Sequence, residues 1–326
     1  MSRRFEWERE VAVQAVREAA RLCQAVAAEI APEAIAKKDK SPVTVADFGS
    51  QAIVAHALAL SFPDDPLIAE EDSAELRQPD HSAILDRVVR HVRSIQTGQS
   101  TEIHADEVCR WIDRGGSGEY RDRFWTLDPI DGTKGFLRGE QYAIALALVL
   151  GGEVGVSALA CPGLDAVFYA VRGEGAFVVP LAAPEEPGPP VKIHVSARNN
   201  PAVVRFCESV ESGHSAHGDA AAIAERLGIT SPPIRMDSQA KYAVVARGEA
   251  DIYLRLPTRA DYREKIWDHA AGAFLVAEAG GTVTDIHGQP LEFRHGRELT
   301  ANRGVIVTNG RLHDPILDAI RELQIV

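Results

Sequence analysis

The spacing of apolar residues divides the chain into a helical beginning, a strand-rich middle and an alternating end. Over residues 6–30, apolar side chains such as Val16, Ala19 and Cys23 recur at steps of three and four. This spacing predicts one amphipathic helix. Further helices are predicted over residues 46–61, 80–96, 101–113, 219–228, 238–248, 266–280 and 313–323.

Strand-like runs fill the stretch from residue 124 to residue 179, where glycine and proline separate them. This pattern predicts antiparallel strands joined by short turns. An earlier run, Leu67-Ile68-Ala69, predicts a short buried strand that ends in acids. After residue 190, runs such as TVTDI and GVIVT alternate with the predicted helices, which indicates α/β layering.

A proline- and alanine-rich segment, PLAAPEEPGPP, separates the two patterns. It has no hydrophobic period, so it is predicted to be a linker. The chain is therefore expected to form two subdomains, an α+β subdomain over residues 1–180 and an α/β subdomain over residues 191–326.

The composition is that of a globular protein that does not bind polyanions in general. The 326 residues are 45% hydrophobic and 25% charged, and the formal net charge is −12. This charge repels nucleic-acid backbones and acidic membranes, so neither is expected as a partner. A small anionic substrate would need a local basic cluster or metal ions.

The cysteines and the N-terminal residues bear on location. Cys23, Cys109, Cys161 and Cys207 form no C-x-x-C pair, so neither a zinc site nor a disulfide framework is expected. The start, MSRRFEWERE, is typical of neither a secretory signal nor a transit peptide. We expect a monomer in a reducing compartment, the cytoplasm.

The stretch LDPIDGTKGF places two carboxylates, Asp128 and Asp131, at one bend. A surface turn would use the same Pro and Asp-Gly residues. Magnesium, however, prefers oxygen ligands, and a pair of ions about 3.5–4 Å apart needs a bridging carboxylate. Asp128, Asp131 and the Ile130 carbonyl could supply such ligands. Gly132 permits close approach of a ligand, and the N–H groups after Thr133 suit a phosphate.

Other acids lie where predicted elements begin or end. Glu70 and Glu71 follow the short strand, and Asp47 and Asp268 lie in the first turns of predicted helices. Each has an ordinary alternative, because acids at a helix start favour the macrodipole and loop acids are readily solvated.

Four motifs, SPVTVAD, EED, LDPIDGT and WDHAAG, occur in this order. They resemble the magnesium-dependent, lithium-sensitive phosphomonoesterases of the inositol monophosphatase superfamily, over nearly the whole chain. Longer stretches, including WTLDPIDGTKGFLRGEQYAIALAL and DSQAKYAVVARGEADIYLRLP, resemble most closely the 3′(2′),5′-bisphosphate nucleotidases. The resemblance implies an α/β (α+β) fold, the layered α-β-α-β-α sandwich of the inositol monophosphatase and fructose-1,6-bisphosphatase type.

The resemblance also implies an activity. Such a phosphoric monoester hydrolase removes the 3′-phosphate of adenosine 3′,5′-bisphosphate (PAP) to give AMP, and can act on the sulfated precursor (PAPS), in sulfur metabolism. Its implied cofactor is magnesium, at two or three ions per site, and its implied partner is the bisphosphate nucleotide.

Roles for single residues follow from the same resemblance. It makes Glu70, Asp128, Asp131 and Asp268 magnesium ligands, together with the Ile130 carbonyl. It makes Asp47 and Thr133 the pair that orients and activates the attacking water, with Glu71 behind the ligands. It implies substrate contacts from Gly132, Thr133, His217, Ser238, Lys241, Arg255 and Asp268.

The basic residues have a physical logic of their own. An acidic protein that binds a bisphosphate needs positive charge aimed at the phosphate that is not hydrolysed, and Lys241, Arg255 and His217 could supply it. Taken singly, each has an alternative: Lys241 as a solvated helix residue, Arg255 as an outward strand residue and His217 as a loop histidine.

Two alternative functions remain. An inositol (poly)phosphate phosphatase would use the same metals, but HSAH, DSQAKY and YLRLP favour a nucleotide. A non-catalytic nucleotide sensor would keep Lys241 and Arg255 and lose the metal-binding acids, all of which are present.

We predict that lithium inhibits the enzyme at magnesium concentrations that support activity. Lithium is close to magnesium in size but carries half the charge, so it would neutralise less phosphate charge and polarise water less. The measurement is phosphate release from PAP in lithium chloride and in potassium chloride at matched ionic strength. Equal rates at millimolar lithium would contradict the prediction.

Overall fold

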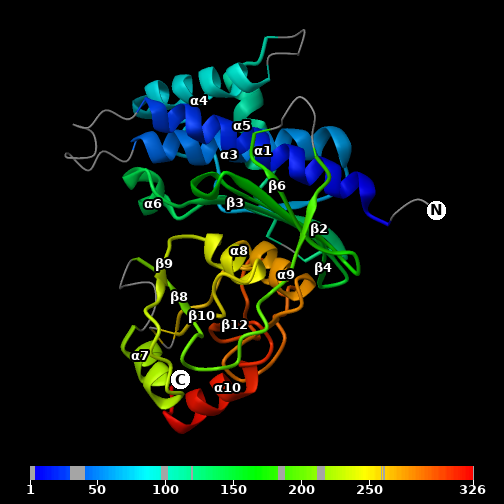
Figure 1. Ribbon diagram of the computed structural model, residues 1–326. Coiled ribbons are helices and arrows are strands. Elements are labelled where there is room, and N and C mark those ends of the chain that lie inside the picture. The colour runs from blue at the N-terminus through cyan, green and yellow to red at the C-terminus, as the bar shows by residue number, and fades with distance from the viewer. Residues whose placement is uncertain are drawn as a thin grey trace.

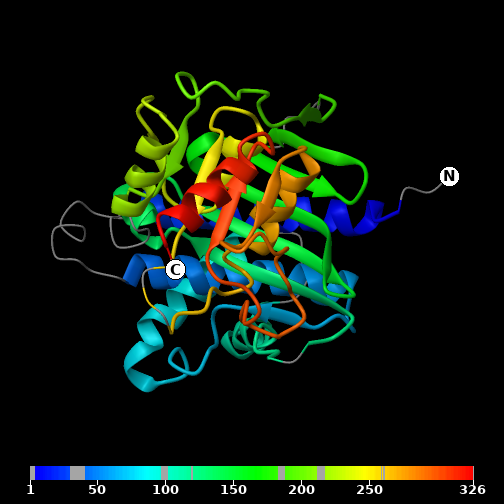
Figure 2. The ribbon, with the colours of Figure 1, turned by 90° about the horizontal axis from the view of Figure 1, so that it is seen from below.

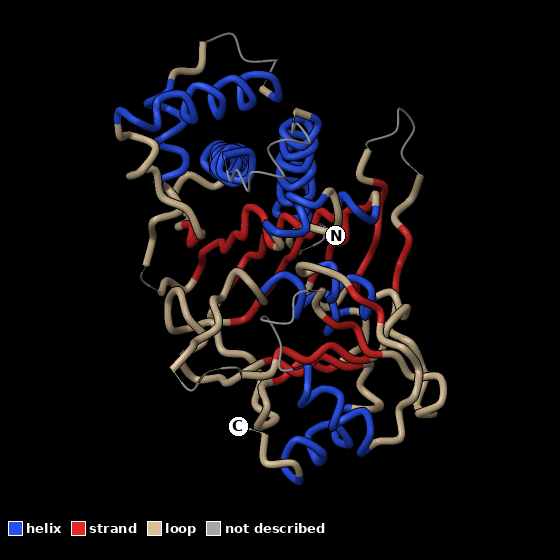
Figure 3. The backbone as a smooth tube through the Cα atoms, turned by 90° about the vertical axis from the view of Figure 1, so that its left-hand side faces the viewer, coloured by secondary structure: helices blue, strands red, loops and turns tan. Residues whose placement is uncertain are grey.

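The protein stacks helices and sheets in alternating layers, as the computed structural model shows (Figures 1 and 3). The structure describes residues 4–29, 41–96, 102–118, 120–182, 188–210, 217–257, 259 and 261–325. From one end to the other the layers are α-β-α-β-α, which confirms the predicted fold class. In the view from below, α10 lies in front of the strands of the first sheet (Figure 2).

The outermost layer consists of helices from the N-terminal third of the chain, and it covers one face of the first sheet (Figure 1). The predicted helix at the N-terminus is confirmed, and its buried side includes Val16, Ala19 and Cys23. The stretch Val43–Ser61 is apolar and long enough to cross a membrane, but 72% of its apolar window is buried inside the protein, so it is a core helix. The layer contains α1 (Glu6–Ala28), α3 (Ser41–Ser61), α4 (Ser82–Ile95) and α5 (Ala105–Asp113).

The first sheet follows chain order from β1 to β7. Strand β1 pairs parallel with β2, and the later neighbours pair antiparallel, as the glycine and proline punctuation predicts. The strands are β1 (Leu67–Ala69), β2 (Arg123–Asp131), β3 (Ala143–Leu150), β4 (Glu153–Cys161), β5 (Ala166–Val171), β6 (Gly175–Pro180) and β7 (Val191–Ile193).

Strand β7 corrects one detail of the predicted boundary. Residues 191–193 were assigned to the C-terminal subdomain, yet Val191 pairs with Val178 of β6 and extends the first sheet. Strand β7 pairs with the free edge of β6, a backbone contact that the spacing of apolar residues does not reveal. The division into two subdomains otherwise stays a prediction.

The second sheet has the order β11-β12-β10-β8-β9. Its strands are β8 (Phe206–Glu208), β9 (Ile234–Arg235), β10 (Ile252–Arg255), β11 (Thr282–Thr284) and β12 (Val305–Thr308). Helices α7 (His217–Arg226) and α10 (His313–Glu322) lie on its outer side (Figure 1).

Helices α8 (Ala240–Ala246) and α9 (Ala270–Glu278) lie between the two sheets (Figure 1). Every residue of α8 is buried. One continuous hydrophobic cluster joins first-sheet residues such as Phe124 to Leu275 of α9 and Val307 of β12. The middle helices therefore place the two halves of the chain against each other.

We predict that Gly272→Ala destabilises the protein. A Cβ atom at Gly272 would lie 2.4 Å from Cγ of Tyr242, so α8 and α9 would have to separate. Overpacking of a core costs about 1–3 kcal/mol, while alanine gains about 1 kcal/mol over glycine in a helix, so we expect a net loss of up to about 2 kcal/mol. Urea unfolding measures it.

The control is Gly218→Ala in α7, where a new Cβ would meet no atom within 4 Å. This variant should be neutral or slightly stabilising. Equal unfolding free energies for the two variants would show that the α8–α9 contact does not limit stability.

Candidate active site

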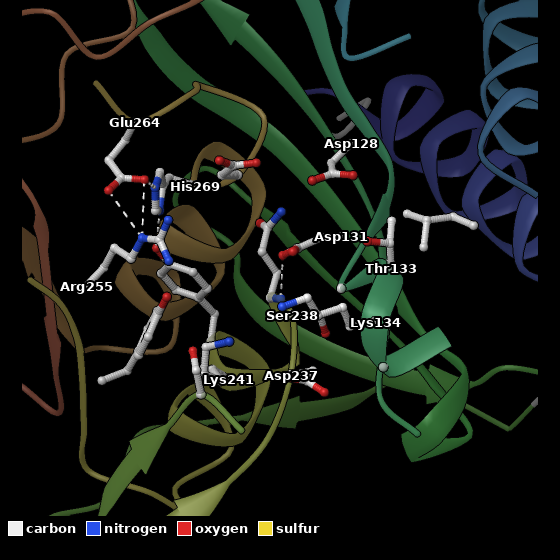
Figure 4. Close-up of a pocket in the computed structure, with 18 of the residues that line it drawn as sticks. Asp128, Asp131, Thr133, Lys134, Asp237, Ser238, Lys241, Arg255, Glu264 and His269 are labelled. Atoms are coloured by element: carbon white, nitrogen blue, oxygen red, sulfur yellow. Dashed lines mark hydrogen bonds and ion pairs between the residues drawn. The ribbon is translucent and has the colours of Figure 1, made fainter. Parts of the chain in front are cut away.

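One cavity of about 270 Å³ collects most of the residues predicted to be functional. Its walls come from both halves of the chain: the ends of β1 and β2 on one side, and α8, β10 and the start of α9 on the other (Figure 4). The predicted residues that line it are Glu70, Asp128, Ile130, Asp131, Gly132, Thr133, Ser238, Lys241, Arg255 and Asp268.

A bulge in β2 brings the first two carboxylates to the same side. Asp128 pairs with Ala145 of β3 and Asp131 pairs with Ala143, so three steps along β2 match two steps along β3. In a regular strand, residues three apart point to opposite faces. The extra residue of the bulge reverses this alternation, and both carboxylates reach the cavity (Figure 4).

A hydrogen bond from Ser50 and the conformation of Gly132 hold this bend in place. The hydroxyl of Ser50, on α3, donates a buried hydrogen bond of 2.7 Å to the carbonyl of Pro129. Gly132 has φ of 90°, and a Cβ atom there would lie 2.8 Å from Cβ of Ser238. A side chain at this position would be strained and would push Ser238 away, so the Asp-Gly-Thr sequence needs its glycine.

The buried side-chain amide of Gln51 holds the loop after β1. Gln51 donates to the carbonyl of Glu71 at 2.6 Å and accepts from the Glu71 N–H at 3.1 Å. Glu70 then lines the cavity, whereas Glu71 is not among the lining residues. A place for Glu71 behind the ligands stays a prediction.

Gln239 connects the two halves of the site. Its backbone N–H donates to Asp131 at 2.6 Å, and its side chain donates to the carbonyl of Trp267 at 2.9 Å. The same side chain accepts from the Gly272 N–H at 3.1 Å. The start of α9, and with it Asp268 two residues before the helix, is thereby fixed relative to the carboxylates of β2.

The acids in this cavity repel one another. Burial, followed by the charges of Glu71 and Asp131, raises the pKa of Glu70 to about 7. Burial also raises the pKa of Asp268 to about 7, against the attraction of His269.

The carboxyl group of Asp128 is the most constrained of these acids. Burial, then the charge of Glu70, raises its pKa well above the ordinary value. Its Oδ1 atom is buried and has no hydrogen-bond partner among the described residues.

These features fit a divalent cation. A buried carboxylate oxygen without a partner is costly, and crowded carboxylates lose much of their repulsion when a cation lies between them. The available donors are carboxylate and carbonyl oxygens, which suit magnesium better than softer metals. The side chains that could hold it are those of Glu70, Asp128, Asp131 and Asp268, with the carbonyl of Ile130.

Of the two residues predicted to activate water, one lies on the cavity wall. Thr133 begins α6 (Thr133–Arg138) and lines the cavity, but Asp47 of α3 does not line it. Asp47 is buried, and burial followed by the charges of Glu71 and Glu70 raises its pKa well above the ordinary value. The hydrogen bonds of the described residues include none between Asp47 and Thr133, so their shared role stays a prediction.

The opposite wall carries positive charge (Figure 4). Lys241 is only 5% exposed, its Nζ lies 5.2 Å from the centroid of the Tyr253 ring, and burial lowers its pKa. No carboxylate of the described residues lies within ion-pair distance of it. Arg255 is part-buried and pairs through Nε with Glu264 at 3.2 Å. Neither residue fits its alternative as an outward, solvated side chain, because both line the cavity.

His217 is the one predicted contact that cannot be placed. It begins α7, but its side chain lies outside the described residues.

Several cavity residues were not predicted from the sequence. The signal was present for some of them, since Gln239 lies within DSQAKY and Glu264 and His269 lie within EKIWDHAAG. The unpredicted lining residues are Lys134, Gly135, Ser209, Asp237, Gln239, Tyr242, Tyr253, Glu264 and His269.

Glu264, Asp268 and His269 also have potential ligand atoms within 4.8 Å of one another. Both ring nitrogens of His269 are already engaged, by Tyr242 at 2.7 Å and by Glu264 at 3.1 Å. Glu264 also contacts the guanidinium of Arg255, which would repel a metal ion. Burial acts to raise the pKa of Glu264, but its bonds with His269 and Arg255 outweigh burial and lower it. Asp268 alone of the three is left for a cation.

Comparisons with known proteins agree with this geometry. The model of the inositol monophosphatase family matches residues 7–324. A 3′(2′),5′-bisphosphate nucleotidase of Emericella nidulans is 43% identical, over 98% of this chain and 99% of that protein. Its counterpart in Schizosaccharomyces pombe is 44% identical, over 97% and 95%, and that of Oryza sativa is 44% identical, over 95% and 92%.

Solved structures at lower identity share the fold. SuhB of Mycobacterium tuberculosis superposes with a TM-score of 0.65 at 20% identity, over 99% of each chain. The inositol monophosphatase from Anabaena superposes with a TM-score of 0.63 at 20% identity, over 98% of this chain and 96% of the other.

The raised pKa values predict how the metal-free protein responds to pH. Between about pH 4 and about pH 7, the folded protein holds protons on Glu70 and Asp268 that the unfolded chain has released. The free energy of unfolding therefore falls as pH rises through this window. Magnesium should restore stability at about pH 8 and have little effect at about pH 5, where protons already neutralise the cluster.

Thermal unfolding with chelator or with magnesium, at both pH values, tests this. Asp128→Asn serves as the comparison, because it removes one of the repelling charges and should flatten the pH dependence of the metal-free protein. A magnesium-induced shift of equal size at both pH values would contradict the prediction.

Proposed function

The chain belongs to the inositol monophosphatase family, and we propose that it removes the 3′-phosphate of adenosine 3′,5′-bisphosphate (PAP) to give AMP. In this proposal it is a phosphoric monoester hydrolase, a 3′(2′),5′-bisphosphate nucleotidase like the relatives described above. It would also act on the sulfated precursor (PAPS), whose 3′-phosphate is the same group.

One observation carries the proposal: a single cavity has an acidic wall and a basic wall (Figure 4). The acidic wall, with Asp128 and Asp131 on β2, suits a metal-bound phosphate that is to be hydrolysed. The basic wall, with Lys241 and Arg255, suits a second phosphate that stays on the product. A bisphosphate is the substrate class that uses both walls.

Magnesium, at two or three ions per site, is the proposed cofactor. When bound, it would supply a Lewis acid that stabilises charge on the phosphate and lowers the pKa of bound water. The chain's own part would be to hold Glu70, Asp128, Asp131, Asp268 and the Ile130 carbonyl at one cavity. The bulge, Ser50 and Gln239 support this proposal, because they fix the segments that carry these groups.

Thr133 and Asp47 are proposed to orient the attacking water. Thr133 lies at the cavity wall, directly after the bend that carries Asp131, and this position supports the proposed role. Asp47 is proposed to accept the proton of the water, which its raised pKa would favour.

Lys241 is proposed to recognise the retained phosphate. Burial lowers its pKa, so its charge is unfavourable until an anion enters the cavity. A dianionic phosphate provides that anion, and the interaction is strong because little water competes with it. An uncharged inositol ring in the same place would leave Lys241 without a counter-charge.

The remaining parts of the proposal concern the setting of the enzyme. We propose a monomer that binds a small bisphosphate nucleotide rather than nucleic acid or membrane. Its described cysteines are all free and buried, which suits the cytoplasm as the proposed compartment.

A panel of substrates tests the function. Phosphate release is measured from PAP, PAPS, inositol 1,4-bisphosphate and inositol monophosphate with magnesium, and the nucleotide product is identified by ³¹P NMR. We expect the highest kcat/KM for the nucleotides and retention of the 5′-phosphate. A higher kcat/KM for either inositol phosphate would favour the inositol phosphatase alternative, and no release from any of the four would favour the sensor.

We predict that Lys241→Met weakens the enzyme for PAP far more than for adenosine 3′-monophosphate. Methionine keeps the apolar stem and removes the charge, which should lose about 1.5–3 kcal/mol of binding to the second phosphate. KM for PAP should rise accordingly, while KM for the monophosphate changes little.

The matched control is Lys192→Met on β7, a residue that does not line the cavity and donates to the carbonyl of Glu174. It should leave both KM values unchanged. Equal losses on both substrates in Lys241→Met would mean that Lys241 supports the fold or the metals instead.

A further inference from the structure

A chain of hydrogen bonds runs along the basic wall of the cavity (Figure 4). The hydroxyl of Tyr242 lies 2.7 Å from Nδ1 of His269, and Nε2 of His269 lies 3.1 Å from Oε2 of Glu264. Nε of Arg255 donates to both oxygens of Glu264, at 3.2 Å and 3.3 Å. The chain links α8, the start of α9, the loop before it and β10.

The members of this chain are costly to bury. Tyr242 is 1% exposed, His269 2% and Glu264 6%. Buried polar groups persist where each is hydrogen-bonded, and a fully connected network fixes the orientation of its members. A carboxylate only accepts, so Nε2 of His269 donates to Glu264, and with a neutral ring Nδ1 accepts from the hydroxyl of Tyr242. The network ends at the guanidinium of Arg255.

We propose that Glu264, His269 and Tyr242 are positioning residues, which hold Arg255 in one orientation for the retained phosphate and thereby set the preference for bisphosphates. The inference rests on the proposed function, in which Arg255 faces that phosphate. It assigns a role to cavity residues for which the sequence predicted none.

The physical reason is preorganisation. An arginine side chain loses rotamer entropy when it is fixed in place, and a binding site gains affinity when this loss precedes binding. Contact at Nε constrains the plane of the guanidinium, because Nε is the atom through which the planar group joins its stem. A phosphate then meets a fork whose direction is already set.

The same network of hydrogen bonds also supports Lys241, the second basic residue of this wall. The Tyr242 ring packs edge-on against Tyr253 with centroids 5.1 Å apart, and Tyr253 lies under the ammonium group of Lys241 at 5.2 Å. Tyr242 therefore contacts Tyr253, which lies under Lys241. It also contacts His269, which is connected to Arg255 through Glu264. Loss of its hydroxyl should release the Arg255 branch while leaving the ring packing beside Lys241 in place.

A different role for the same atoms is a metal site formed by Glu264, Asp268 and His269. The contacts of His269 on both sides, and of Glu264 with a guanidinium, argue against it. The two roles make different predictions: a positioning residue changes KM for the bisphosphate, whereas a metal ligand changes the magnesium requirement for every substrate.

Paired substitutions at Glu264 provide the test. Glu264→Ala removes the contact with Arg255. Glu264→Gln keeps an oxygen that accepts from Arg255, and its amide can donate to His269 once the ring takes the other tautomer. Glutamine therefore restores the position of Arg255 without the charge. Tyr242→Phe interrupts the far end of the chain, and Glu322→Gln, in the exposed pair with Arg226, is the control.

KM and kcat are measured for PAP and for adenosine 3′-monophosphate, together with the magnesium concentration for half-maximal rate and calorimetric binding of AMP. In Glu264→Ala we expect KM for PAP and Kd for AMP to rise about tenfold, the scale of one charge-assisted hydrogen bond. We expect kcat, the magnesium requirement and KM for the monophosphate to stay within about twofold of wild type, which on the same scale is less than one such bond.

Glu264→Gln should stay within about threefold of wild type for PAP, and Tyr242→Phe should raise its KM by about threefold, each less than the loss of a whole hydrogen bond. If Glu264→Ala fails to fold, Tyr242→Phe still decides, because its ring packing is retained. Glu322→Gln should match wild type throughout.

Three results would overturn the inference. Equal losses in the alanine and glutamine variants would mean that charge matters and position does not. Equal losses on both substrates, or no loss in Tyr242→Phe, would mean a purely structural role. A raised magnesium requirement for both substrates would mean that Glu264 is a metal ligand.

These results are separable from failure of the proposed function. If wild type releases no phosphate from PAP, the function itself is wrong. If wild type hydrolyses PAP and the variants do not discriminate between PAP and the monophosphate, only the positioning role is wrong.

Discussion

Repulsion among the carboxylates of one cavity is the interaction around which the rest of the structure is arranged. Glu70, Asp128, Asp131 and Asp268 come from segments far apart in the chain and meet in one cavity, where burial and mutual repulsion raise the pKa values of Glu70, Asp128 and Asp268. Such a cluster is unfavourable in a protein without a cation, because neither water nor other residues fully compensate it. The stable layers on both sides supply the free energy that holds it together.

The residues around the carboxylates oppose that repulsion by fixing the segments that carry them. Ser50 and the bulge of β2 hold two carboxylates on one side, and Gln239 connects Asp131 to the segment before α9, in which Asp268 lies. The basic wall then lies across the cavity rather than among the acids, so its charges are available to an incoming anion. Separation of the two charges within one cavity is what a bisphosphate can exploit and a monophosphate cannot.

Much of this could be predicted from the sequence, for physical reasons. Glycine and proline separate the strands between residues 124 and 179, and the acids lie in motifs at element ends. The sequence therefore predicts both the strands and the acids. Strand β7 was assigned to the wrong half, because its position depends on pairing with β6 rather than on its own residues. The network from Tyr242 to Glu264 was missed although each member lies in a quoted motif, since it depends on how α8 packs against α9. Asp47, predicted to act beside Thr133, does not reach the cavity wall, which no local pattern indicates.

The most direct test of the account is magnesium binding by calorimetry in wild type and in Asp131→Asn, together with phosphate release from PAP. Asparagine keeps the size of the side chain and an oxygen that can still accept the N–H of Gln239, but it removes the negative charge that magnesium needs. The account predicts that Asp131→Asn stays folded, binds magnesium much more weakly and loses activity by orders of magnitude. Normal turnover in Asp131→Asn at ordinary magnesium concentrations would contradict it.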